Sequence, residues 1–183
     1  MKMSPFFTAV VLATLSFDTI AASPVFSLGS TDIPENRVLT QKQIFNGFGC
    51  EGENISPQLH WQHPPQGTKS YAITLFDPDA PTGSGWWHWT VVNIPASIHT
   101  LPSGVKVETI STGMVQGRND FGYAGFGGAC PPVGDKPHRY QFTLWALNTD
   151  ALPVDHNTSG ALVGFMLNSH VIAKAELTAT YGR

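Results

Sequence analysis

Residues 77–89 constrain the fold and function of this chain more than any other segment. Within thirteen residues they carry two carboxylates, one imidazole and three indoles. An apolar run at 71–76 precedes the segment and another at 89–94 follows it, so we expect a strand on each side. The two prolines and two glycines between these runs suit neither a helix nor a strand interior. We therefore predict a stiff loop that brings Asp77 and His88 to one rim of a sheet, where binding groups commonly lie.

The composition suits a single β-rich domain. The chain has 183 residues, enough for one domain with a sizeable core. Charged residues make up only 13%, whereas 18 glycines and 14 prolines supply many turns. The sequence contains no internal repeat, heptad run or low-complexity tract. We expect one domain over residues 23–183.

The first 22 residues have the features of a secretory signal peptide. Lys2 precedes an apolar run at residues 6–17, and small residues follow, which is the usual order in export signals. The run is too short to span a bilayer. We predict cleavage after Ala21 or Ala22 and a mature protein that is periplasmic or secreted. The alternative is an uncleaved N-terminal anchor.

Charge and cysteine content narrow the partners and cofactors. A net charge of −3 without a basic run argues against nucleic acid and anionic membranes as main partners. We expect no stable membrane insertion. In an exported protein the even pair Cys50 and Cys130 favours a disulfide, and the alternative is two buried, reduced thiols. The cysteine spacing matches no metal motif, and we expect neither a metal nor another cofactor.

Strand patterns dominate the rest of the chain. Residues 138–147 show the clearest alternation, and residues 26–28, 55–61 and 175–181 show it more weakly. Apolar residues at helical spacing predict one helix over residues 159–171. About seven strands and one late helix, without regular βαβ alternation, predict a mainly β, antiparallel two-sheet β-sandwich with a short C-terminal helix and a closing strand.

Residues 113–134 are unusually rich in glycine. A phosphate-binding P-loop needs a Gly-Lys-Ser/Thr ending, which is absent here. The dinucleotide-binding pattern also fails, because Cys130 stands where its third glycine should fall. Two interpretations remain open. The segment is either a long surface loop that needs glycine dihedrals, or backbone that comes close to a ligand.

Asp77, Asp79, His88 and His138 are the candidates for chemistry. Two histidines and a carboxylate could ligate a metal, although their spacing matches no local metal motif. Ser84 lies near His88 and could act as a nucleophile, but there is no Gly-x-Ser-x-Gly elbow. Imidazoles, glycine-loop amides and a tyrosine hydroxyl could instead hold a small anion. The simplest alternative is a set of hydrogen-bonded turn residues.

Two longer motifs resemble the signatures of the phosphatidylethanolamine-binding protein (PEBP) family, which includes the Raf kinase inhibitor proteins. The first is Asp77-Pro78-Asp79-Ala80-Pro81 followed by Trp86-Trp87-His88-Trp89-Thr90-Val91-Val92-Asn93-Ile94. The second is Pro131-Pro132 followed by His138-Arg139-Tyr140. The resemblance covers essentially the whole mature chain. It is closest to the exported bacterial branch of the family, the YbcL-like proteins.

This resemblance implies a PEBP-like fold with a small, shallow anion pocket at one end. In that family such pockets accept phosphate-like and carboxylate groups, including phospholipid and phosphopeptide head groups. The resemblance implies that the pocket is lined by Asp77, Trp86, His88, Gly128, Cys130, Pro132, His138 and Tyr140. Cys130 departs from the family pattern, which has glycine at this position, and it adds a side chain to the pocket wall.

The functional hypothesis is an exported protein that binds a small phosphate, phosphorylated head group or carboxylate and modulates another protein without being an enzyme. One alternative is a hydrolase that uses His88 and His138 as acid and base. Another is a protein-interaction inhibitor of a kinase or protease. Asp77 should repel a bound anion unless it orients a histidine or accepts a hydrogen bond from a protonated ligand oxygen. In either case we expect monoanions to bind better than dianions.

Overall fold

The computed structural model describes residues 24–34, 37–106 and 113–183. The predicted signal peptide, residues 1–22, lies outside these residues. Within the described part, no helix is both long enough and apolar enough to cross a membrane.

The strands form three antiparallel sheets. The central sheet has the order β10-β9-β5-β6-β8, with bounds Val171–Tyr181, His138–Leu147, Ser70–Asp77, Trp86–Pro95 and Val115–Gln116. The second sheet has the order β1-β4-β7, with bounds Ser27–Gly29, Leu59–Gln62 and Thr100–Leu101. A two-stranded ribbon pairs β2 with β3, at Asn46–Gly47 and Cys50–Glu51. The helices are a short 3-10 helix, η1, at Gln41–Gln43 and α1 at Gly160–His170.

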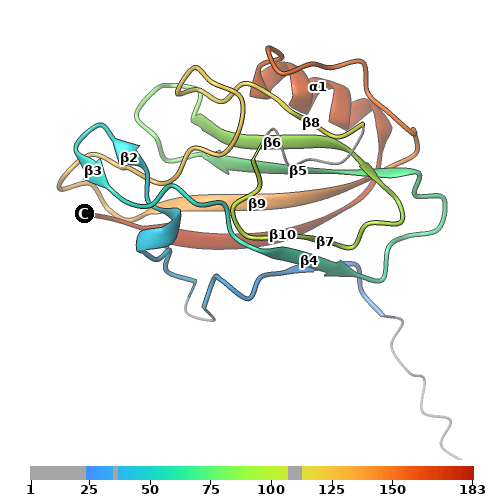
Figure 1. The fold of residues 1–183 in the computed structure, drawn as a ribbon, viewed down its shortest axis with the longest axis horizontal. Coiled ribbons are helices and arrows are strands. Elements are labelled where there is room, and N and C mark those ends of the chain that lie inside the picture. The colour runs from blue at the N-terminus through green and yellow to red at the C-terminus, as the bar shows by residue number, and fades with distance from the viewer. Residues whose placement is uncertain (1–23, 35–36, 107–112) are drawn as a thin grey trace, which may run out of the picture.

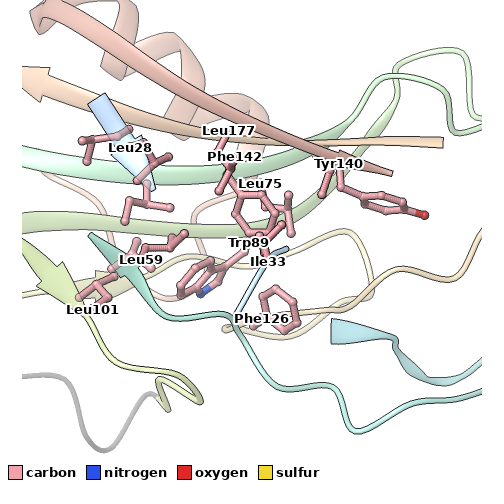
Figure 2. Packing of buried hydrophobic residues seen from close by; sticks show 14 of the residues in the cluster. Leu28, Ile33, Leu59, Leu75, Trp89, Leu101, Phe126, Tyr140, Phe142 and Leu177 are labelled. Carbon is pink, nitrogen blue, oxygen red and sulfur yellow. The ribbon is translucent and has the colours of Figure 1, made fainter. Parts of the chain in front are cut away.

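Apolar layers cover both faces of the central sheet. The larger layer joins the two sheets through buried side chains that include Leu28, Leu59, Leu75, Trp89 and Phe142 (Figure 2). The smaller layer packs Val163 and Leu167 of α1 against Ala72, Val92 and Leu147. Figure 1 shows this order, with α1 at the top, the central strands in the middle and β4 at the bottom. Because β5 is covered on both faces, its apolar run is continuous rather than alternating.

The predicted mainly β fold with two antiparallel sheets and one late helix is confirmed. Strand β9 has the predicted bounds, and the runs at 71–76 and 89–94 lie within β5 and β6. The helix begins after Ser159 because Ser159 is its N-cap, whose side chain accepts a hydrogen bond from Leu162 N. Strand β10 begins four residues earlier than predicted, since a β-bulge between Val171 and Ala173 interrupts the alternation there.

Candidate functional site

A β-bulge in β6 sets the position of His88. Leu75 of β5 pairs with Trp89, but the next residue, Phe76, pairs with Trp87. His88 is therefore the extra residue on β6. Such bulges re-aim side chains and are common beside functional sites.

The His88 ring is fixed by the glycine-rich loop. Its Nδ1 lies 2.8 Å from the carbonyl oxygen of Gly127, and Gly127 N donates in return to the His88 carbonyl at 2.9 Å. Because a carbonyl can only accept, Nδ1 carries the proton and Nε2 remains for another partner. Burial lowers the pKa of His88 below its ordinary value, and the Gly127 carbonyl partly opposes this effect. A bound anion would favour the protonated ring, in which both nitrogens donate.

Asp77 at the end of β5 orients His138 at the start of β9. Asp77 Oδ2 lies 2.8 Å from His138 Nδ1, and both side chains are buried. Asp77 Oδ1 accepts a hydrogen bond from Asp79 N at 2.8 Å. Both carboxylate oxygens are thus engaged by the protein. Of the explanations considered for a carboxylate in this position, the geometry supports the orientation of a histidine.

Asp79 has a different role from Asp77. It accepts hydrogen bonds from the Arg139 backbone N at 2.9 Å, from Nε at 2.8 Å and from Nη2 at 2.6 Å. These bonds to Arg139 lower the pKa of Asp79 to about 2. Asp79 does not line the pocket described next. It ties the loop after β5 to the start of β9.

A cavity of about 160 Å³ lies at this rim of the central sheet. It is lined by seven of the eight predicted residues: Asp77, Trp86, His88, Cys130, Pro132, His138 and Tyr140. Gly128 is the exception. Its amide donates to Asn54 Oδ1 at 2.7 Å, and a Cβ at this position would collide with the Gln43 carbonyl oxygen. Glycine is required there for close backbone packing, and a contact between Gly128 and a bound anion stays a prediction.

Six further residues complete the cavity walls: Phe48, Ala80, Pro81, Thr82, Phe121 and Pro131. Phe121 stacks on Phe45 with ring centroids 4.0 Å apart, and Phe48 lies 5.7 Å from Phe121. The position of Phe121 between glycines was a visible signal of an aromatic wall. Phe48 also lies between two glycines, Gly47 and Gly49, but its place at the pocket depends on a contact between segments distant in sequence.

Two buried donors in the cavity lining, the Tyr140 hydroxyl and Trp86 Nε1, have no hydrogen-bond partner among the described residues. Burial raises the pKa of Tyr140, and the charge of Asp77 raises it further, so the hydroxyl remains a donor. Figure 2 shows this hydroxyl turned away from the apolar cluster. An unpaired buried polar group costs about 1–3 kcal/mol, which favours a bound acceptor in this cavity.

A disulfide bond and hydrogen bonds from Arg183 hold the outer wall of the pocket. The predicted disulfide between Cys50 and Cys130 is confirmed. Arg183 donates through Nε to the Pro131 carbonyl at 2.6 Å and through Nη1 to the Gly49 carbonyl at 2.7 Å. Figure 1 shows the β2–β3 ribbon beside the C-terminus, as these contacts require. The covalent and polar links join the same two segments.

The structure does not bring together the residues needed for the metal site or the serine nucleophile considered above. Among the described residues, no group of three His, Cys, Asp or Glu side chains is placed to hold a metal ion. Ser84 does not line the pocket. The hydroxyl that does, on Thr82, donates to the Gly85 carbonyl at 2.5 Å.

Fold and site together define a two-sheet β-sandwich with a small, donor-lined cavity at one rim of its central sheet. The chain belongs to the phosphatidylethanolamine-binding protein family, whose family model matches residues 30–182. The predicted family membership is thereby confirmed.

Relatives support this assignment along nearly the whole chain. The sequence is 58% identical to the UPF0098 protein YbcL of Escherichia coli K12 over 182 residues, 98% of each chain. It is 47% identical to YbhB of the same organism over 154 residues, 83% of this chain and 97% of YbhB.

Solved structures show the same fold. The crystal structure of E. coli YbcL, described as a member of the PEBP family, matches with a TM-score of 0.84 and 60% identity, covering 86% of this chain and 98% of that one. CT736 of Chlamydia trachomatis D/UW-3/CX, described as a PEBP homologue, matches with a TM-score of 0.73 and 31% identity, covering 88% of this chain and 99% of that one.

Proposed function

We propose that this protein binds a small anionic group in the cavity, such as a phosphate, a phosphorylated head group or a carboxylate, and modulates another protein rather than catalysing a reaction. The observation that carries the proposal is the set of unpaired donors. Among the described residues, neither the buried Tyr140 hydroxyl nor Trp86 Nε1 has a partner, and both side chains line the cavity together with the two histidine rings. An acceptor-rich anion would satisfy them.

Size and charge favour a small monoanion. The cavity of about 160 Å³ is smaller than the roughly 300–1,000 Å³ of drug-sized sites, so it suits a head group rather than a whole large ligand. Asp77 remains beside the ligand, and its repulsion grows with the charge of that ligand. A phosphate monoester with one proton, a sulfonate or a carboxylate fits these conditions.

The proposal includes export. A basic residue, Lys2, before an apolar run supports it, and so does the Cys50–Cys130 disulfide, because such bonds persist in oxidising compartments. N-terminal sequencing of the protein from the periplasm or medium should give Ala22 or Ser23 as the first residue. Intact Met1 in a membrane fraction would favour an uncleaved anchor.

A hydrolase is the second candidate because of one observation. The 2.8 Å contact between Asp77 and His138 has the arrangement of a base and the group that orients it. Incubation with p-nitrophenyl phosphate and p-nitrophenyl acetate tests this alternative. Turnover that His138→Ala abolishes would establish catalysis, whereas ligand binding without turnover favours the binding function.

Thermal unfolding in the presence of anions tests the binding function. A ligand that binds only the folded state stabilises it by about 2.7 kcal/mol at a concentration of 100 Kd. Sulfate, phosphate, methanesulfonate and acetate should raise Tm above that in chloride of equal ionic strength. No rise in Tm with any of the four anions would contradict the proposed function.

A further inference from the structure

The His138 ring lies between two carboxylates. Its Nδ1 is 2.8 Å from Asp77 Oδ2, and its Nε2 is 3.4 Å from Asp135 Oδ2. Ionised carboxylates can only accept, so in each of these contacts the ring nitrogen is the donor. Because Nδ1 is committed to Asp77, Nε2 is the ring nitrogen that an anion could use. Asp135 already occupies that position.

The two carboxylates are held very differently. The Asp77 side chain is 4% exposed and both of its oxygens are hydrogen-bonded. The Asp135 side chain is 42% exposed, and within the described structure its carboxylate contacts His138 alone. Asp135 lies on a turn in which Gly134 N donates to the Arg183 carbonyl at 3.0 Å. The backbone of this turn is anchored, whereas the carboxylate is free to rotate.

A displaced Asp135 carboxylate could turn into a neighbouring hollow. The His138 ring lines the anion pocket on one side and a hollow of about 420 Å³ on the other. Asp135 lines this hollow, but not the anion pocket, together with Asp79, Lys136 and Arg139. Arg139 is already bonded to Asp79, so Lys136 is the other cationic residue of the hollow. Rotation of Asp135 away from Nε2 would therefore leave its carboxylate in a hollow that Lys136 also lines, without moving His138 or Asp77.

We propose that Asp135 is a specificity-determining residue of the pocket, an internal competitor that occupies His138 Nε2 when no ligand is bound and discriminates against dianions. This inference rests on the proposed anion-binding function. A bound anion must displace the carboxylate, which then remains nearby as a negative charge. Since the Coulomb energy scales with the product of the charges, the residual repulsion is about twice as large for a dianion as for a monoanion.

Calorimetric titration of sulfate and methanesulfonate into the wild type and Asp135→Asn tests the competition. Sulfate should bind Asp135→Asn about two- to fivefold more tightly, the range expected for an exposed ion pair. The gain for methanesulfonate should be smaller. Asp150→Asn is the matched control, because it removes an equally negative, exposed residue away from the site and should leave both affinities unchanged. Asp77→Asn should act in the opposite direction and weaken binding.

A double variant separates displacement from repulsion at a distance. If Asp135 competes for Nε2, the gain from Asp135→Asn should largely disappear in a His138→Gln background. If Asp135 only repels the ligand through space, the full gain persists there. Long-range ¹H–¹⁵N spectra of the ligand-free protein give an independent readout. The His138 Nε2 resonance should move in Asp135→Asn and stay in place in Asp150→Asn.

The outcomes are distinct. Tighter sulfate binding by Asp135→Asn that depends on His138, with the predicted Nε2 change, supports the inference. Unchanged or weaker binding by Asp135→Asn, or a gain that persists without His138, overturns the inference while the proposed function stands. No binding of either sulfate or methanesulfonate by the wild type or by Asp135→Asn overturns both.

Discussion

Two neighbouring residues of β6, Trp87 and His88, belong to regions of opposite character. Trp87 packs beneath α1, where Gly160 leaves room for the indole and a Cβ would collide with it. His88 belongs to the pocket rim, where the Tyr140 hydroxyl and Trp86 Nε1 have no partner among the described residues. The helix layer is largely apolar and closely packed, whereas at the rim two unpaired donors belong to side chains that line a cavity. The helix layer therefore serves the fold, and under the proposed function the rim serves binding.

A cavity in the helix layer should have the largest effect, and on stability alone. Leu167 is fully buried, so Leu167→Ala should lower the free energy of unfolding by about 2–5 kcal/mol. Phe165→Ala on the exposed face of the same helix is the control and should change it by less than about 0.5 kcal/mol. Urea denaturation measures both. A large loss of sulfate affinity in folded Leu167→Ala would show that the helix layer and the rim do not act independently.

Removal of the disulfide should affect both stability and binding, because Cys130 lines the pocket. The bond links residues 80 positions apart, and the variant with Cys50→Ser and Cys130→Ser should lose roughly 2–5 kcal/mol of stability. Sulfate affinity should fall only modestly, since Arg183 still joins the same two segments. A free-thiol assay on denatured, unreduced wild type should find no thiols. Two thiols per chain would show that the disulfide is absent.

Tyr140→Phe should separate binding from stability at the rim. Without a ligand, loss of an unpaired buried hydroxyl should leave stability unchanged or slightly raise it. Sulfate binding should weaken by about 1.5–3 kcal/mol, the range for a hydrogen bond to a charged group. Denaturation and calorimetry measure the two quantities. A clear loss of stability without ligand would mean that the hydroxyl has a partner in the free protein.

The smallest expected effect is the pH dependence contributed by His88. Burial lowers its pKa in the folded state, so below the unfolded-state pKa of ~6.5 the unfolded chain binds a proton that the folded chain does not. Stability without ligand should therefore fall as the pH drops through ~6.5, and His88→Gln should reduce this slope. Sulfate affinity should instead rise over the same range, because the bound anion favours the protonated ring and sulfate itself stays charged. A pH slope of stability equal in both proteins would remove His88 as its source.

The sequence predicted the fold well where pattern and topology agree. The alternation at 138–147 matched β9, and the apolar runs around residues 77–89 matched β5 and β6. Seven of the residues that the family resemblance implies for the pocket lie together around the cavity. These parts were predictable because period-two patterns and turn residues act locally.

Contacts between distant segments were not predictable in this way. Phe48 enters the pocket wall from the β2–β3 turn, and Arg183 clamps that turn to Pro131. Gly128 was assigned to the pocket through the family resemblance, and the structure shows that it packs closely against the segment around Gln43. The different roles of Asp77 and Asp79 likewise depend on their distant partners, which are His138 and Arg139.

Calorimetric titration of sulfate into the wild type, His88→Ala and His138→Ala tests the central claim most directly. Both rings are buried in the pocket lining, so each variant should bind sulfate more weakly by about 1.5–3 kcal/mol, as expected for loss of a charge-assisted hydrogen bond. Circular dichroism checks that each variant remains folded. Wild-type affinity in both folded variants would contradict the assignment of this pocket as the anion site.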